Sequence, residues 1–339
     1  MARSENRKPT SFDVAKLAGV SRSAVSRAYT PGANISDETR EKVMAAAAEL
    51  GYRVNSLARG LQQEHSGIVG LVASRLDTPL RSRQVRLLSE ALIREGFKPM
   101  LITAERPDDV SSLIEILLGY SIAGIIVTSD SPPRALIEEC GRLRLPVVLV
   151  NRAGVSNWGD RVVADNQGGG QLAFDVLFAA GARRIACMMP EKETYSVSGR
   201  CKAFVEAAAQ NEVPCRILHV TDQSYQDARQ AMRTVDPDIL DDVDGVFCAT
   251  DLIALGALDA LRIDLGLNVP QDIQVLGFDD IEQASWGSYD LTTIRQDVPE
   301  QTDTVLRLLT ERIADSSLPN RVEKQNLVSV LRGTTLTTP

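Results

Sequence analysis

The sequence predicts an α/β protein in two parts, a small all-α head followed by a two-lobed, doubly wound parallel α/β core. Three observations support this prediction. Residues 10–51 hold three short helical patterns with cap residues at their ends. From residue 66 onward, short apolar runs alternate with amphipathic helical stretches. The full length of 339 residues is too great for one ordinary domain.

The charge of the chain is unevenly distributed. Residues 1–61 hold ten Lys/Arg and six Asp/Glu, a net charge of +4. The remaining residues hold 27 basic and 39 acidic side chains, a net charge of −12. A basic head on an acidic body is expected where only the head meets a polyanion. A merely solvated basic face explains the charge pattern equally well.

Each of the three predicted head helices has a hydroxyl residue at its start. The cap residues are Thr10 or Ser11 for the first helix, Ser21 for the second and Ser36 for the third. The first helix is expected to have an apolar face made of Val14, Ala15, Leu17 and Ala18. Gly19 supplies the turn after it and Gly51 ends the third helix, since glycine reaches positive φ without steric cost.

The second head helix has two faces. Ala24, Val25 and Ala28 are expected to point inward, which leaves Arg22, Ser23, Ser26 and Arg27 pointing outward. Two short helices joined by a glycine turn, with arginine on the second, are typical of a helix-turn-helix that reads the major groove. Arginine can pair with guanine through two hydrogen bonds. The alternative is a small three-helix bundle whose arginines are only solvated.

This segment resembles the DNA-binding head of the LacI/GalR family of transcriptional regulators. The specific pieces are DVAKLAGVS, VSR, TREKV, AELGY and N-x-x-A-R-x-L. The resemblance implies a helix-turn-helix domain over residues 1–54, with base contacts from Arg22, Ser23 and Arg27. Ser21, Ser26 and Asn34 are expected to add further DNA contacts.

Residues 55–65 are expected to form a hinge and linker. A helix from Asn55 to Gln62 is too short to be stable alone in water, and Gly60 weakens it further. The family resemblance implies that this segment folds on DNA as paired hinge helices. Leu61 then matches a leucine that wedges into the minor groove, and Ala58 matches the small residue where the two helices meet. Asn55, Ala58 and Leu61 are therefore expected DNA contacts.

The core, residues 66–339, alternates predicted strands and helices. The predicted strands are 67–73, 99–103, 123–128, 146–150, 184–189, 245–249 and 273–278. The predicted helices are 83–96, 109–119, 169–181, 200–210 and 251–266. This alternation indicates parallel sheets covered by helices on both faces. Because the core is too long for one ordinary sheet, we expect two lobes with a ligand cleft at the carboxyl ends of the strands.

The core resembles the same family, and hence the periplasmic-binding-protein type I-like fold, along nearly its whole length. The telling segments are ADNQGGG, GARRIACM, CATDLIALGALDAL, QVLGFDDIEQ and LTTIRQD. The resemblance implies three crossings between the lobes, near Asn166, Arg295 and residue 325. One lobe is then 66–165 plus about 296–324, and the other is 166–295 plus about 325–339. It also implies a small effector between the lobes.

Arg200 in RCKAF and Asp279 in GFDD stand at the family's effector-binding arginine and cleft aspartate. Such a pair suits a polyhydroxylated ligand, and Arg200 can equally bind a carboxylate or a phosphate. The alternative is a salt bridge that only stabilises a loop. Further expected cleft residues are Thr78, Leu80, Asn151, Thr250 and Gln296. Aromatic residues usual in the family after the first strand are missing from DTPLRSRQ, so Trp286 is expected to provide an aromatic platform or else to pack in the core or a subunit contact.

Catalytic and metal chemistry find little support in the sequence. It contains no G-x-S-x-G, P-loop or H-E-x-x-H motif. Gly168, Gly169 and Gly170 open a helix and could cradle an anion, but they do not form G-x-G-x-x-G, so dinucleotide binding has little support. Asp279 and Asp280 lack an apparent third metal ligand. The five cysteines show no C-x-x-C spacing and are expected to be reduced thiols. We therefore expect no enzyme activity, no cofactor and no metal.

The combined prediction is a cytoplasmic, sequence-specific DNA-binding regulator, most simply a repressor. No apolar run of membrane-spanning length and no secretory signal is present. A periplasmic binding protein would share the core but carry a signal and no helix-turn-helix. The C-terminus lacks leucine heptads, which favours a homodimer on a pseudo-palindromic operator over a tetramer. The expected effector is a sugar or sugar derivative, including phosphorylated or acidic forms, with a purine or a phosphoprotein partner as alternatives.

Overall fold

The computed structural model describes residues 7–30, 32–53, 67–103, 117, 119–128, 134–152, 158–192 and 194–336. The chain divides into two compact units, Met1–Ser66 and Gly67–Pro339. The expected hinge contacts Asn55, Ala58 and Leu61 lie outside the described residues, as does nearly all of the predicted helix 109–119.

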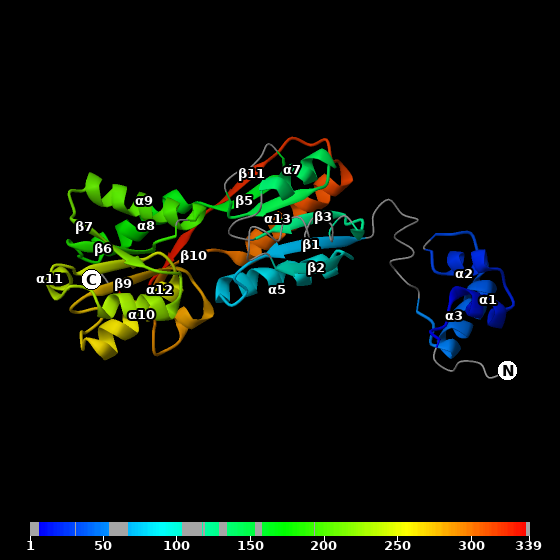
Figure 1. The fold of residues 1–339 in the computed structure, drawn as a ribbon, viewed down its shortest axis with the longest axis horizontal. Helices are drawn as coiled ribbons and strands as arrows, with labels where there is room; N and C mark the ends of the chain where they lie inside the picture. Colours follow the sequence, from blue (N-terminus) through cyan, green and yellow to red (C-terminus); the bar gives the residue numbers. More distant parts are fainter. Residues whose placement is uncertain are drawn as a thin grey trace. The chain divides into compact units, whose positions relative to one another are not determined.

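The first unit contains the three predicted helices, α1 (Ser11–Ala18), α2 (Arg22–Ala28) and α3 (Asp37–Leu50) (Figure 1). Thr10 precedes α1, and its backbone N–H and its hydroxyl both donate to the Asp13 carboxylate, at 2.8 and 2.7 Å. The hydroxyls of Ser21 and Ser36 accept backbone N–H groups at the starts of α2 and α3. Gly19 and Gly51 end α1 and α3 with φ of 67° and 62°, as predicted.

The core of this unit differs from the prediction at one residue. Val14 and Ala15 of α1 pack with Val25 of α2 and Val43 of α3. Leu17, expected on the apolar face, is 46% exposed. Because successive residues turn by about 100° around a helix, Leu17 lies well to one side of the stripe formed by Val14, Ala15 and Ala18. The prediction for Leu17 was wrong.

The second unit contains two six-stranded sheets. The first has the order β11-β5-β4-β3-β1-β2 and is parallel throughout. The second has the order β12-β10-β9-β8-β6-β7 and is parallel except for β12. The strands are β1 (Ile68–Ala73), β2 (Lys98–Thr103), β3 (Gly124–Val127), β4 (Val147–Val150), β5 (Asp160–Ala164), β6 (Ile185–Pro190), β7 (Cys215–Val220), β8 (Gly245–Cys248), β9 (Gln274–Asp279), β10 (Thr292–Arg295), β11 (Val322–Gln325) and β12 (Val328–Val330).

Helices cover both faces of the first sheet, which defines lobe 1. One face packs on α5 (Pro79–Arg94) and α13 (Val298–Ala314), through residues such as Leu88 and Leu309. The other face packs on α7 (Arg134–Arg142), through Leu136 and Ile137. Burial on both faces explains why β1, β3 and β4 are continuous apolar runs, which is what made these strands predictable.

The second sheet and its helices define lobe 2 (Figure 1). Its helices are α8 (Asn166–Ala179), α9 (Tyr195–Gln210), α10 (Tyr225–Arg233), α11 (Pro237–Asp241) and α12 (Asp251–Asp259), with a π-helical turn η2 (Ala260–Asp264) and a 3₁₀ turn η3 (Glu282–Ser285). The chain passes between the sheets after β5, after β10 and after β11. These three segments are called the first, second and third crossings below.

The glycine run at the start of α8 serves close packing. A Cβ on Gly170 would lie 2.1 Å from the backbone oxygen of Arg200 in α9, and one on Gly169 would lie 2.5 Å from Leu327 Cδ1. The Asp165 carboxylate already caps this helix, accepting from the Gly168 N–H at 2.9 Å. The alternative of an anion cradle is therefore wrong, because the Asp165 carboxylate occupies the position and the glycines have a packing role.

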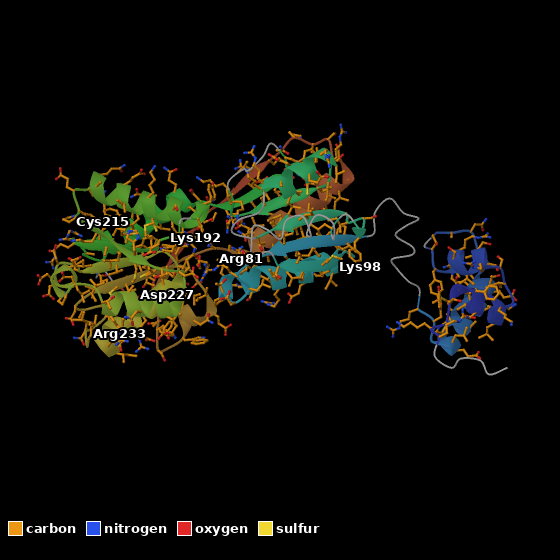
Figure 2. The ribbon with its side chains drawn as sticks, in the orientation of Figure 1. Arg81, Lys98, Lys192, Cys215, Asp227 and Arg233 are labelled. Atoms are coloured by element: carbon orange, nitrogen blue, oxygen red, sulfur yellow. The ribbon has the colours of Figure 1, made fainter. Side chains whose placement is uncertain are left out.

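All five cysteines are free thiols. Four are buried, and Cys215 on the edge strand β7 is partly exposed (Figure 2). None of the described helices has the length and apolar character needed to cross a bilayer. Within the described part of the chain, no three His, Cys, Asp or Glu side chains are grouped so as to hold a metal ion.

Candidate nucleic-acid interface and ligand cavity

The outward face of α2 carries the predicted DNA-reading side chains. Arg22, Ser23, Ser26 and Arg27 are all exposed, whereas Val25 and Ala28 are buried in the unit's core. Among the described residues, the Arg22 side chain has no hydrogen-bond or ion-pair partner, so its guanidinium is available to a ligand. Arg27 folds back along the helix, donating through Nη2 to Ser23 Oγ at 3.4 Å. Arg22 is thus the more readily available of the two arginines.

Two further predicted contacts flank this helix. Ser21 is exposed and its hydroxyl lies 2.8 Å from that of Ser23, so the two form one polar edge at the start of α2. Asn34 is exposed in the segment that leads to α3. The first unit therefore presents all six of the predicted head contacts on its surface.

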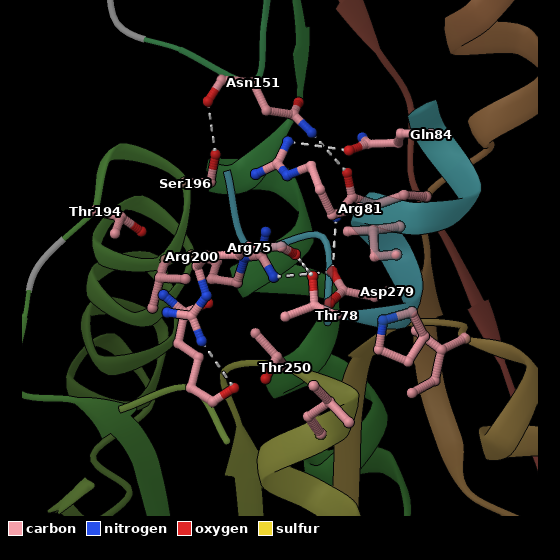
Figure 3. A pocket seen from close by; sticks show the side chains of 17 residues that line it. Arg75, Thr78, Arg81, Gln84, Asn151, Thr194, Ser196, Arg200, Thr250 and Asp279 are labelled. Atoms are coloured by element: carbon pink, nitrogen blue, oxygen red, sulfur yellow. Dashed lines mark hydrogen bonds and ion pairs between the residues drawn. The ribbon is translucent and has the colours of Figure 1, made fainter. Parts of the chain in front are cut away.

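A polar cavity lies between the two lobes at the carboxyl ends of the strands (Figure 3). It encloses about 690 Å³ of non-protein space, including its open mouth. Three threonines that precede helices line it: Thr78 before α5, Thr194 before α9 and Thr250 before α12. Three helix N-termini therefore meet at the cavity, an arrangement that favours electron-rich ligand atoms.

The structure brings seven of the eight predicted effector residues to this cavity. They are Thr78, Leu80, Asn151, Arg200, Thr250, Asp279 and Gln296. Trp286 is the exception: it follows η3, is 48% exposed and does not line the cavity. The expectation of a tryptophan platform is corrected accordingly, because the 3₁₀ turn directs this side chain to the surface.

Arg200 and Asp279 form the buried polar centre of the cavity. Arg200 Nη1 donates to Ala249 O at 2.9 Å and to Asp279 Oδ1 at 3.3 Å, and its guanidinium stacks 3.6 Å from the Phe278 ring centroid. Gln296 Nε2 donates to the same Asp279 Oδ1 at 2.7 Å. Both bonds end on Oδ1, and no donor among the described residues bonds to Oδ2, so Oδ2 is available to a further donor. Arg200 and Asp279 thus form a salt bridge, as the alternative of a loop-stabilising pair expects. Both side chains also line the cavity, which that alternative does not explain.

Burial sets the protonation behaviour of this centre. Burial raises the pKa of Asp279, and Arg200 and the Gln296 amide act in the opposite direction. A second buried carboxylate, Asp251, accepts from Thr293 Oγ1 at 2.6 Å and from the Ile281 N–H at 2.8 Å. Burial, followed by repulsion from Asp279, raises the pKa of Asp251 to about 7. Two acidic groups with raised pKa therefore support one buried arginine.

The neighbouring Asp280 is neutralised by arginines. Its carboxylate lies 2.6 Å from Arg295 Nε and 2.6 Å from Arg332 Nη2. The Asp279–Asp280 sequence therefore does not form a paired acidic site. The alternative that these two carboxylates coordinate a metal ion is therefore wrong, because Asp280 pairs with two arginines.

Asn151 connects lobe 1 to lobe 2 at the cavity. Its backbone has a φ of 54°, and its Nδ2 donates to Gln296 Oε1 at 3.0 Å. Its backbone oxygen accepts from Ser196 Oγ at 3.1 Å, and its Oδ1 accepts from the Ala164 N–H at 2.8 Å. The side chain thus joins β5 of lobe 1 to the second crossing, and the backbone oxygen makes the contact with α9 of lobe 2.

Several cavity residues were not predicted from the sequence. They are Arg75, Arg81, Gln84, Ser196 and Gln223, all on segments that follow strand ends. Arg75 bridges the lobes, since its Nη1 lies 2.6 Å from Asp222 Oδ1 and its Nη2 donates to Gln223 O. The strand before Gln223, β7, was itself not predicted. The position of a polar residue just after a strand is the signal that would have found this group.

Two family models match the sequence. Residues 12–55 match that of bacterial regulatory proteins of the lacI family. Residues 174–335 match that of a periplasmic binding protein-like domain. The matched ranges cover the helices of the first unit and most of lobe 2.

Similar proteins and structures span nearly the whole chain. The sequence is 34% identical to the HTH-type transcriptional regulator CelR of Thermobifida fusca, over 91% of this chain and 92% of that protein. The structure is similar to the Lac repressor dimer bound to operator and the anti-inducer ONPF, with a TM-score of 0.85, 27% identity, and coverage of 98% and 100% of the two chains. A complex of the transcriptional regulator CelR with cellobiose gives a TM-score of 0.70, 30% identity, and coverage of 96% and 99%. These similarities confirm the predicted fold class.

Proposed function

Because this chain belongs to the LacI family of bacterial regulatory proteins, we propose that it is a transcriptional repressor that binds operator DNA through its head and a small metabolite between the lobes of its core. One observation carries the proposal: a helix-turn-helix with exposed polar side chains and a polar cavity occur in the same chain. An enzyme would need a catalytic constellation, and the family is one of regulators.

The proposed ligand is a sugar or sugar derivative. The cavity pairs a buried arginine with a buried aspartate and adds threonine and amide groups, which together can donate to and accept from several hydroxyls. Arg200 and the helix N-termini also suit an acidic or phosphorylated form. The similar CelR structure holds cellobiose, which supports a carbohydrate as the class to test first.

The proposed DNA complex is a homodimer on a pseudo-palindromic operator. The similar Lac repressor structure is a dimer bound to its operator. Arg22, Ser23 and Arg27 are the proposed base-reading side chains, and Leu61 is the proposed minor-groove wedge, as the family pattern implies. Ligand binding alters the operator affinity only if the ligand binds two states of the protein with different affinities.

The experiment that tests this function uses sheared genomic DNA. The pure protein is incubated with the fragments, with and without a metabolite pool, and the retained DNA is sequenced. A retained pseudo-palindrome whose half-sites lie about one helical turn apart is the expected result. A change in retention when the pool is added identifies a ligand response. Retention without any shared sequence would contradict the repressor proposal.

Arg22→Ala is expected to weaken binding to the retained operator by about 1–3 kcal/mol and to relax the base preference at one position of each half-site. The reason is the loss of a base-edge contact. Lys42→Ala, which removes an exposed charge from α3, serves as the control and should leave base preference unchanged. Binding of operator variants by fluorescence anisotropy checks both. Equal selectivity in the Arg22 variant and the wild type would exclude Arg22 as a reader.

A further inference from the structure

Three buried glutamines form a row that starts at the cavity and ends at the third crossing. Gln84 on α5, Gln301 on α13 and Gln325 at the end of β11 are 1%, 3% and 7% exposed. Gln84 Nε2 donates to Gln301 Oε1 at 2.7 Å, and Gln301 Nε2 donates to Gln325 Oε1 at 3.0 Å. The three residues are distant in sequence, so only the fold joins them. The row is called the glutamine relay below.

The relay has a direction, and Arg81 sets it. Arg81 Nη1 donates to Gln84 Oε1 at 3.1 Å, and both residues line the cavity (Figure 3). Because the Gln84 side-chain oxygen accepts from Arg81, the Gln84 amide nitrogen points toward Gln301. Gln301 must then accept from Gln84 and donate to Gln325. Each amide orientation follows from the one before it.

The direction leaves one buried donor unsatisfied at the far end. Gln325 Nε2 is buried and has no hydrogen-bond partner among the residues that the structure describes. An unsatisfied buried N–H group is costly and is rarer in proteins than an under-satisfied carbonyl. If all three amides rotated by 180°, Gln325 would donate to Gln301 and Gln301 to Gln84. The buried donor would then be satisfied, and the Gln84 amide nitrogen would be released toward the cavity.

The far end of the relay lies where the crossings meet. The Gln325 backbone oxygen accepts from the Asp165 N–H of the first crossing at 2.9 Å. Lys324 Nζ also lies 2.7 Å from Asp165 Oδ1. Gln301 is in the first turn and a half of α13, directly after the second crossing. The relay therefore touches, directly or through one hydrogen bond, all three segments that join the lobes.

We propose that the glutamine relay couples the cavity to the crossings, with Gln301 and Gln325 as positioning residues whose amide orientation is set by the hydrogen bond from Arg81 to Gln84. An oxygen of a ligand that accepts from both Arg81 and Gln84 would draw Arg81 away and favour the reversed orientation. The amide at the third crossing then changes its partner when the cavity is filled. The role in ligand response rests on the proposed function, but the relay itself does not.

The test uses the full chain without DNA or ligand. A failure of the relay proposal is therefore distinguishable from a failure of the proposed function. The protein is labelled with ¹⁵N-glutamine, and the side-chain NH₂ signals are followed by NMR, with Gln84→Met, Gln301→Met and Gln325→Met used for assignment. Arg81→Met removes the donor to Gln84 and should reverse the relay. The Gln325 NH₂ should then gain a hydrogen bond, and its exchange with solvent should slow by about tenfold.

Arg83→Met is the matched control, because Arg83 lies on the same helix and is exposed away from this cavity. It should leave the Gln325 signal unchanged. Adding Gln301→Met to Arg81→Met should abolish the effect at Gln325, because the relay is cut. An unchanged Gln325 signal in Arg81→Met, or an equal change in Arg83→Met, would overturn the proposal. If the double variant does not fold, the two arginine variants still decide the outcome.

Discussion

Asp160→Ala is expected to lower the free energy of unfolding of the core by about 3–5 kcal/mol, the range for removing one partner of a buried ion pair. Asp160 and Arg312 are both fully buried, and Arg312 donates to both carboxylate oxygens, at 2.9 and 2.8 Å. Arg321 donates to the same carboxylate at 2.9 Å. Without the carboxylate, the Arg312 charge would stay buried with no anionic partner, beside the carbonyl oxygens of Leu318 and Pro319 and the Trp158 ring, whose centroid lies 5.7 Å away.

Urea unfolding of the variant and the wild type at pH 7 checks this loss. Glu311→Ala is the control, because Glu311 also pairs with Arg321 but is 41% exposed; solvent screens such a pair, so its removal should cost much less than the removal of Asp160. A loss of stability in Asp160→Ala no greater than in Glu311→Ala would show that the buried pair is not important for stability.

The same ion pair gives the stability a defined pH dependence. Burial alone raises the pKa of Asp160, but hydrogen bonds from Arg312 and Arg321 outweigh it, and the net shift is downward. A carboxyl group whose pKa is lowered on folding stabilises the protein fully above its unfolded pKa of about 3.9. That contribution is lost as the pH falls through the lower, folded value. Asp160→Ala should therefore lose less stability than the wild type on acidification below about pH 4.

The sequence predicted those parts of the fold that have a local cause. The cap residues Ser21 and Ser36 and the turn glycines act within a few residues of themselves. Strands such as Ile68–Ala73, buried on both faces, appear as unbroken apolar runs. Five strands were missed. The edge strands β7 and β11 have mixed sequences, CRILHV and VEKQ, because one side of an edge strand meets solvent. The interior strands β5 and β10, DRVVA and TTIR, and the short edge strand β12 lack a long apolar run.

Cavity residues were predictable where a family motif or the end of a predicted strand marks the position. Arg200 and Asp279 stand in motifs of the family, and the structure brings them within 3.3 Å of each other. Arg81 and Gln84 stand in an ordinary polar stretch, RSRQ, of a helix whose first turn faces the cavity. Nothing in that stretch distinguishes the buried Gln84 from the exposed Arg83. The partner that reveals it, Gln301, lies 217 residues away in sequence.

Asp279→Asn is expected to weaken ligand binding by about 3 kcal/mol, roughly a hundredfold, because a charged acceptor in a buried site is replaced by a neutral one. The substitution preserves the shape of the side chain, and asparagine tolerates the positive φ of 121° at this position better than most residues. Operator binding without ligand should stay within about threefold of the wild type, because Asp279 lies in the core and the DNA-reading side chains lie in the head. The prediction therefore separates ligand response from DNA binding.

The measurement uses the operator that the genomic-DNA experiment identifies. The active fraction of the metabolite pool is titrated into the protein–operator complex, and the fraction of operator that stays bound is measured. Asp280→Asn is the matched control: it removes the adjacent carboxylate, which pairs with Arg295 and Arg332 and does not line the cavity. It should respond to ligand at nearly the wild-type concentration. A full response in Asp279→Asn would mean that the ligand makes no charged contact there. The Arg200–Asp279 pair would then be a structural bridge, and the ligand would have to be held by the lobe 1 side of the cavity, where Arg75, Arg81 and Gln84 lie.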